Sequence, residues 1–269
     1  MMAAMMPKPR SILITGASSG IGKALAIEYA AAGTHLALGG RNQERLKSVA
    51  AECKGKGASV TVGLVDIRDR SKLSQWIFSV DDENPIDLVI ANAGITAGTG
   101  MGRLREHPDI VRSVIETNLL GVINTIDPAL ERMCMRGGGR IAVMGSLGAL
   151  RGMPYCPSYS ASKAAVHTYA EGLRGGVARL GVGVTIIAPG FVSTPLNNAI
   201  VCPKPLLMSE DRAARIIRRG LDRGRAVIAF PRALYYGLLL ARLLPLRWAD
   251  AAFAAVHVDV PEKFDSMAD

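Results

Sequence analysis

The stretch Ser11-Ile-Leu-Ile-Thr15-Gly16-Ala-Ser-Ser-Gly20-Ile-Gly22 decides the fold of this chain. It opens with a β-branched apolar run, typical of a buried strand, and passes directly into three closely spaced glycines. The next residues, Lys23 to Ala32, have the periodicity of a helix. A strand, a glycine turn and a helix in this order form a cradle for phosphate, because the helix begins with unpaired backbone N–H groups. The alternative is a glycine-rich turn that holds no ligand.

The same alternation of strand and helix continues along most of the chain. It predicts further strands at 34–40, 60–66, 87–91, 140–144, 183–188 and 225–230, and helices at 42–56, 69–80, 108–136, 158–180 and 209–223. Pro128 is expected to kink the longest of these helices. Strict alternation predicts an α/β fold with a mostly parallel, doubly wound sheet of seven strands and helices on both faces. No linker interrupts the series, so we expect residues 1–232 to form a single domain.

Candidate ligand-binding residues follow the ends of the predicted strands. Open parallel sheets bind their ligands at the carboxyl ends of the strands. Six segments of this chain are expected to meet there: Gly16–Gly22, Gly40-Arg41, Asp66, Asn92–Gly94, Ser146 and Pro189-Gly190. Their convergence predicts one binding site rather than scattered polar residues.

Tyr159 and Lys163 form a candidate proton-transfer pair. They are four residues apart in a predicted helix, so they lie on one face, one turn apart. The Lys163 ammonium would favour the phenolate and lower the pKa of Tyr159 from its ordinary value of about 10. Such a phenol could exchange a proton with an alcohol or carbonyl oxygen. The spacing alone is common, and the alternative is a surface tyrosine and lysine on an amphipathic helix.

In this order and spacing, the residues resemble the compact form of the short-chain dehydrogenase/reductase family. The resemblance covers roughly residues 10 to 230 and six ordered elements, which together are far more specific than any one of them. The elements are Thr15-Gly16-x-x-x-Gly20-x-Gly22, Asn92-Ala93-Gly94, Asn118, Ser146, Tyr159-x-x-x-Lys163, and Pro189-Gly190 with Thr194.

The resemblance implies a Rossmann domain that binds a nicotinamide cofactor and transfers hydride between that cofactor and a carbinol or carbonyl carbon. It makes Tyr159 the acid/base and Ser146 the group that holds the substrate oxygen. Lys163 would lower the pKa of Tyr159 and form a hydrogen bond with the nicotinamide ribose. Asn118 would stabilise a bend in its helix and hold a water molecule that relays protons to Lys163. The implied cofactor-binding residues are Gly16, Ser18, Ser19, Gly20, Ile21, Gly22, Arg41, Asp66, Ile67, Asn92, Ala93, Gly94, Tyr159, Lys163, Pro189, Gly190, Val192 and Thr194.

The end of the second predicted strand favours NADP(H) over NAD(H). NAD-selective sites usually carry an acid there, which binds the ribose 2′-hydroxyl. This chain has Leu38-Gly39-Gly40-Arg41, with no acid and one guanidinium that could pair with a 2′-phosphate. The alternative is that Arg41 only starts the next helix. Asp66 is expected to accept a hydrogen bond from the adenine amino group, as the family position does.

Composition limits the other function classes. Apolar residues make up 49% of the 269 and charged residues 20%, which fits a globular protein and excludes a disordered one. The net charge is +9, but aromatics are only 5% and no nucleic-acid-binding signature is present. The four cysteines have no Cys-x-x-Cys pair and the four histidines no metal-like spacing, so we expect reduced thiols, no metal, and a cytoplasmic location.

Two segments depart from the family pattern. The predicted helix 158–180 places Ala161, Ala165, Gly172 and Gly176 on one face, which suggests a homodimer or homotetramer joined through that helix. The tail, residues 233–269, is an apolar and basic helical extension of the domain. Residues 233–248 are too short to span a bilayer. They are expected either to pack in the core or an oligomer contact, or to lie on the inner face of a membrane beside basic residues (Arg218, Arg219, Arg223, Arg232 and Arg247).

Substrate contacts are expected from loops beyond the strand ends, at 95–106, 147–156 and 191–208. The last two are mostly apolar, which suggests a hydrophobic alcohol or ketone; their apolar residues are Leu147, Leu150, Met153, Phe191, Leu196, Ile200, Leu206, Leu207 and Met208. The alternative function is a non-catalytic cofactor-binding sensor or membrane-surface scaffold. That alternative predicts the loss of a catalytic residue, whereas Asn118, Ser146, Tyr159 and Lys163 are all present.

Overall fold

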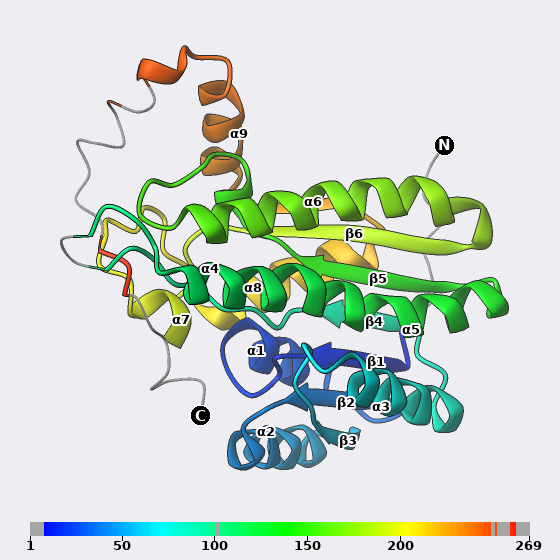
Figure 1. Cartoon of the computed structure of the whole chain (residues 1–269). Coiled ribbons are helices and arrows are strands. Elements are labelled where there is room, and N and C mark those ends of the chain that lie inside the picture. The colour runs from blue at the N-terminus through cyan, green and yellow to red at the C-terminus, as the bar shows by residue number, and fades with distance from the viewer. Residues whose placement is uncertain (1–7, 101–102, 249–250, 252–258, 262–269) are drawn as a thin grey trace.

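The computed structural model describes residues 8–100, 103–248, 251 and 259–261. Its seven strands form one parallel sheet in the order β3-β2-β1-β4-β5-β6-β7 (Figure 1). This confirms the predicted doubly wound sheet. The strands are β1 (Ser11–Thr15), β2 (His35–Gly40), β3 (Ser59–Leu64), β4 (Leu88–Ala91), β5 (Gly139–Met144), β6 (Val182–Pro189) and β7 (Val227–Phe230).

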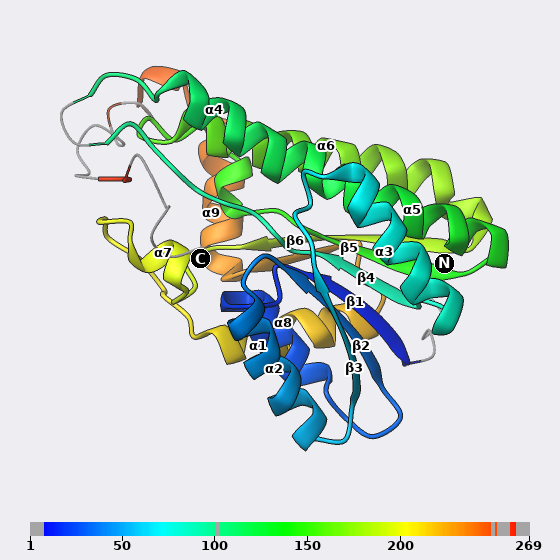
Figure 2. The ribbon, with the colours of Figure 1, turned by 60° about the horizontal axis from the view of Figure 1, so that its bottom comes forward.

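Helices cover both faces of the sheet, as Figure 2 shows. On one face lie α1 (Gly20–Tyr29), α2 (Gln43–Gly55) and α8 (Glu210–Asp222), and on the other α3 (Arg70–Glu83), α5 (Gly121–Arg136) and α6 (Pro157–Val177). The central strand, β1, shows why helices are needed on both faces of the sheet. Ile12 and Ile14 pack into the first core and Leu13 into the second, and all three are fully buried. A strand buried on both faces reads as a continuous apolar run, which is the pattern that opens this chain.

Most helices begin at the residues that the sequence predicts. Asn42, Asp69 and Ser209 each accept a hydrogen bond from the backbone N–H three residues further on, and so cap α2, α3 and α8. Such caps satisfy N–H groups that have no partner inside the helix.

The predicted long helix at 108–136 is instead interrupted. It consists of α4 (Pro108–Ile115), a π-helical turn (Glu116–Leu120) and α5, which runs through Pro128 to its end at Arg136. The regular α-helical pattern is therefore broken at the π turn rather than at the proline. The π turn contains Asn118, whose side chain is fully buried and bonded to other segments. A widened turn at a functional position is typical of π-bulges.

Shorter elements cover the carboxyl end of the sheet. They are α7 (Pro195–Asn198), which begins the loop between β6 and α8, and α9 (Arg232–Ala241), which follows β7. No residue of α9 is buried, so the expectation that this segment packs in the core is wrong. None of the described helices has the length and apolar character needed to cross a membrane.

Candidate active site

The glycine turn after β1 packs against the end of β4. The Asn92 amide donates to the carbonyls of Thr15 and Gly16, at 3.0 and 3.2 Å, and Thr15 Oγ1 accepts from the backbone N–H of Asn92 at 3.2 Å. Gly16 has φ +66°, a left-handed conformation that favours glycine, and a Cβ on Gly22 would overlap the Gly16 carbonyl. Backbone therefore lies directly against backbone, and α1 begins close to the sheet.

The N-terminus of α1 is open to a cavity. Ser19, its N-cap, makes no side-chain capping bond, and no acid occurs in the first turn of this fully described helix. Ser18, Ser19, Gly20 and Ile21 line a cavity of about 590 Å³. The backbone N–H groups and the positive end of the helix dipole are thus available to an anion. This cradle fits the diphosphate of a dinucleotide.

Nearly all of the predicted site residues line this one cavity. The exceptions are Gly22 and Asn118, which lie behind the glycine turn and behind Ile95. From the other strand ends come Arg41, Asp66, Ile67, Asn92, Ala93, Gly94, Ser146, Tyr159, Lys163, Pro189, Gly190, Val192 and Thr194. Thr194 also caps α7, because its hydroxyl accepts from the Asn197 backbone N–H at 3.1 Å.

One end of the cavity is rich in arginine. Arg41, Arg45 and Arg68 line it together with Asp66. Both oxygens of Asp66 accept from the Arg68 guanidinium, with a shortest contact of 2.6 Å. These hydrogen bonds, and the charges of Arg68 and Arg41, outweigh burial and hold the pKa of Asp66 below its ordinary value. Three guanidinium groups against one carboxylate leave this end of the cavity positive.

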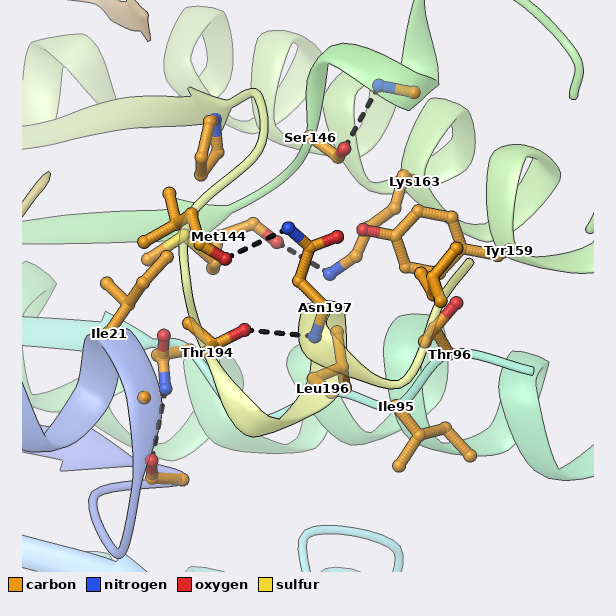
Figure 3. Close-up of a pocket in the computed structure, with 18 of the residues that line it drawn as sticks. Ile21, Ile95, Thr96, Met144, Ser146, Tyr159, Lys163, Thr194, Leu196 and Asn197 are labelled. Atoms are coloured by element: carbon orange, nitrogen blue, oxygen red, sulfur yellow. Dashed lines mark hydrogen bonds between the residues drawn. The ribbon is translucent and has the colours of Figure 1, made fainter. Parts of the chain in front are cut away.

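Ser146, Tyr159 and Lys163 meet further along the cavity, as Figure 3 shows. Ser146 follows β5, and its Oγ accepts from the Gly148 backbone N–H at 3.0 Å. Tyr159 and Lys163 come from adjacent turns of α6, and the Lys163 ammonium donates to the Met144 carbonyl at 2.9 Å. The phenol of Tyr159 faces the same space as the Ser146 side chain. A hydroxyl, a phenol and an ammonium therefore face one space.

Burial has the largest effect on the pKa values of Tyr159 and Lys163. It raises the pKa of Tyr159, while the neighbouring Ser146 side chain acts in the opposite direction. It also lowers the pKa of Lys163 to about 8. The expected lowering of the Tyr159 pKa by Lys163 is not met in this structure. The ammonium lies 5.9 Å from the centre of the phenol ring and is bonded to Met144, and desolvation outweighs its attraction.

Asn118 connects the catalytic helix to the loop after β4. Its side-chain oxygen accepts from the Ile95 backbone N–H at 2.8 Å, and its amide donates to the Ile95 carbonyl at 2.9 Å and to Ser162 Oγ at 3.1 Å. Ser162 in turn donates to the Tyr159 carbonyl at 2.7 Å. Asn118 thus fixes the turn of α6 that carries Tyr159.

His167 contacts the site although no motif in the sequence indicates it. Its Nε2 accepts from the Ser146 backbone N–H at 3.3 Å. Burial, and then the charge of Lys163 one turn away, lower the pKa of His167 to about 4, so the ring is neutral at physiological pH. The four-residue spacing from Lys163 is the only sequence signal that could have indicated this position.

The rest of the cavity is lined mainly by apolar residues, although Arg151 and Asn197 also line it. Of the residues expected there, Leu147, Met153, Phe191, Leu196 and Ile200 line it. Leu150, Leu206, Leu207 and Met208 are not among its lining residues: Met208 pairs with Val192 and joins the core, and Leu206 and Leu207 are exposed. The sequence missed Leu234 and Leu238 from α9 and Val260 near the C-terminus, which also line the cavity.

Comparison with known proteins agrees with this geometry. The family model for the short chain dehydrogenases matches residues 10–203. The chain therefore belongs to the short-chain dehydrogenase/reductase family, a family of nucleotide-binding oxidoreductases.

The chain is similar to an uncharacterized relative and to two solved structures that hold different cofactors. An uncharacterized oxidoreductase of Myxococcus xanthus is 35% identical over 90% of this chain and 96% of its own. A short-chain dehydrogenase from Sphingobium yanoikuyae, solved with NADPH, has a TM-score of 0.75 and 25% identity over 87% of this chain and 93% of its own. A family member from Burkholderia phymatum, solved with NAD, shares the fold with a TM-score of 0.77 and 20% identity, over 86% and 92% of the two chains.

Proposed function

We propose that this protein is an NADP(H)-dependent oxidoreductase that interconverts a hydrophobic secondary alcohol and the corresponding ketone. The observation that carries the proposal is that Ser146 and Tyr159 face the same part of a largely apolar cavity, beside buried Lys163. A hydroxyl and a phenol that converge on one space can both bind a single substrate oxygen.

In ketone reduction each of these side chains has a separate role. The nicotinamide, when bound, supplies the hydride. Ser146 Oγ accepts from Gly148, so its own proton is available to a substrate oxygen. Tyr159 gives its proton to that oxygen, and its raised pKa keeps the phenol protonated at neutral pH. The Lys163 ammonium then stabilises the phenolate that remains. Alcohol oxidation uses the same groups in reverse.

The arginine-rich end of the cavity supports NADP(H) rather than NAD(H). Arg41 would pair with a 2′-phosphate, and Arg45 and Arg68 line the same end of the cavity. Because both Asp66 oxygens accept from Arg68, recognition of adenine by Asp66 stays a prediction.

Charge reversal at Arg41 tests the cofactor preference. We expect Arg41→Glu to lower kcat/KM for NADPH by about a hundredfold, because it replaces an attractive contact with a repulsive one, and to change the value for NADH far less. Arg179→Glu, an exposed site at the far end of α6, is the matched control. Equal activity of the parent protein with NADH and NADPH would contradict the preference.

The lining beyond Tyr159 supports a hydrophobic substrate. Leu147, Met153, Phe191, Leu234 and Leu238 surround the space into which a substrate carbon chain would extend. A panel of aliphatic and aromatic ketones, followed by the loss of NADPH absorbance, tests this directly. We expect kcat/KM to rise with the apolar area of the ketone. A preference for small charged carbonyl compounds would contradict the proposed substrate class.

A further inference from the structure

We propose that α9 and the residues after it, Arg232–Trp248, form a docking surface for an anionic lipid bilayer. We call this segment the α9 surface. The proposal concerns where the protein lies, and it does not depend on the proposed reaction.

The first observation is the exposure of large apolar side chains on the α9 surface. Leu240, Leu243 and Leu246 are 66%, 82% and 70% exposed. Tyr236, Leu244 and Trp248 are 51%, 46% and 59% exposed. Six exposed large apolar residues fall within thirteen positions of the chain, whereas the exposed apolar residues of an ordinary protein surface are scattered.

The second observation is that α9 is held to the body by its opposite side. Leu234 and Leu238 are one turn apart and both line the cavity, and Leu234 packs near Gly190. Figures 1 and 2 both show α9 at the end of the sheet where the strands finish. The helix is thus held on its cavity side by Leu234 and Leu238, while its Tyr236 and Leu240 are exposed.

The third observation is the charge of this segment. No Asp or Glu occurs between Asp222 and Asp250, and Arg232, Arg242 and Arg247 on the α9 surface are exposed. Arg218, which was expected beside a basic membrane face, does not belong to this surface, because it lies on α8 and pairs with Glu28 on α1 at 3.5 Å. Leucines flanked by arginine without acids are typical of segments that bind anionic lipid headgroups.

The same charges disfavour a second copy of the chain as the occupant. A two-fold contact through the α9 surface would bring three arginines from each copy together, with no acid on either surface to pair with them. An anionic bilayer supplies that missing negative charge. Trp248 and the edge-to-face pair Tyr235 and Tyr236 fit the same occupant, because amphipathic aromatic rings favour the headgroup boundary.

The test is sedimentation of the full chain with vesicles. One set contains phosphatidylcholine mixed with phosphatidylglycerol, and the other contains phosphatidylcholine alone. We expect binding to the anionic set, and a loss of about tenfold or more in both Leu240→Glu/Leu243→Glu and Arg242→Glu/Arg247→Glu. The matched controls are Met135→Glu/Leu180→Glu, which are exposed apolar sites elsewhere, and Lys47→Glu/Lys54→Glu on α2; both should bind as the parent does.

Fluorescence of Trp248 supplies a second readout that does not rely on charge-reversed variants. Anionic vesicles should shift the emission of the parent to shorter wavelength, and Trp248→Phe should lose that shift while Trp76 remains. The proposal is overturned if the parent ignores anionic vesicles, or if the variants of the α9 surface bind as well as the controls. It is also overturned if Leu240→Glu/Leu243→Glu lowers the molecular mass in solution while vesicle binding is absent, since a second copy then covers this surface.

Discussion

At the residue scale, burial brings the pKa of Lys163 close to physiological pH. Burial lowers its pKa from 10.5 to about 8, so the ammonium is present below that pH and is lost as the pH rises through it. We expect kcat/KM for ketone reduction to fall about tenfold per pH unit above pH 8, because the phenolate of Tyr159 then loses its neighbouring cation. A pH profile from 6 to 10 at saturating NADPH measures this. A flat profile across that range would contradict the assigned role.

The same pH profile distinguishes the titration of Lys163 from that of its neighbour His167. The pKa of His167 is lowered to about 4, so its ring should not titrate between pH 5 and 8. The sequence could predict that Ser146, Tyr159 and Lys163 lie close together, because Ser146 follows a strand and the other two lie one turn apart on the next helix. It could not reveal His167, nor the rise in the Tyr159 pKa, because both depend on how tightly the surrounding walls exclude water.

At the element scale, residues 259–261, which we call the strap, join the loop at Val201 to the 98–100 loop beside the cavity. Asp259 pairs with Val201 through backbone bonds of 2.8 and 2.9 Å. The carbonyls of Val260 and Pro261 accept from the backbone N–H groups of the 98–100 loop at 3.1 and 3.0 Å. Val260 itself is 2% exposed and lines the cavity. The strap thus adds one wall to the substrate side.

We expect Val260→Ala to enlarge the substrate space without changing the binding of NADPH. The ratio of kcat/KM for a bulkier ketone to that for a smaller one should rise by about tenfold, which is typical when a pocket gains the volume of one or two methyl groups. Steady-state kinetics with a matched ketone pair gives the ratio, and Val201→Ala, an exposed neighbour outside the cavity, is the control. An unchanged ratio would show that Val260 has no part in specificity.

The regular elements were largely predictable, because a period of two or of 3.6 residues is written in the local sequence. The π turn at Glu116–Leu120 was not, since it follows from the bonds of Asn118 to Ile95 and Ser162, residues far apart in the chain. The strap was not predictable for the same reason. Val260 has no local pattern that links it to Val201 or Gly98.

At the scale of the whole molecule, one exposed face of α6 is shaped for close contact. Ala161, Gly172 and Gly176 are exposed and Ala165 partly so, and open space lies where a Cβ on either glycine would point. We propose that two copies of the chain meet through this face, as a dimer or within a tetramer. Small residues allow two helices to approach closely and pack backbone against backbone.

An arginine at position 172 should separate the copies without weakening the fold. Gly172→Arg fills the open space, and it also removes a helix-interior glycine that costs about 1 kcal/mol. We expect a monomeric mass by light scattering and a melting temperature of the monomer that is not lower. Gly55→Arg on α2, where the space is equally open, should leave the mass unchanged. A parent protein that is already monomeric at micromolar concentration would refute the proposed contact.

We propose above that Tyr159 transfers the proton to a substrate oxygen in a cavity that binds NADPH. The most direct measurement compares Tyr159→Phe with Tyr155→Phe, which removes a second hydroxyl from the same cavity. Each variant is assayed for NADPH binding by fluorescence titration and for ketone reduction. We expect unchanged NADPH binding in both, a loss of about a thousandfold in kcat for Tyr159→Phe alone, and near-parent activity for Tyr155→Phe. Full turnover by a Tyr159→Phe protein that binds NADPH normally would contradict it.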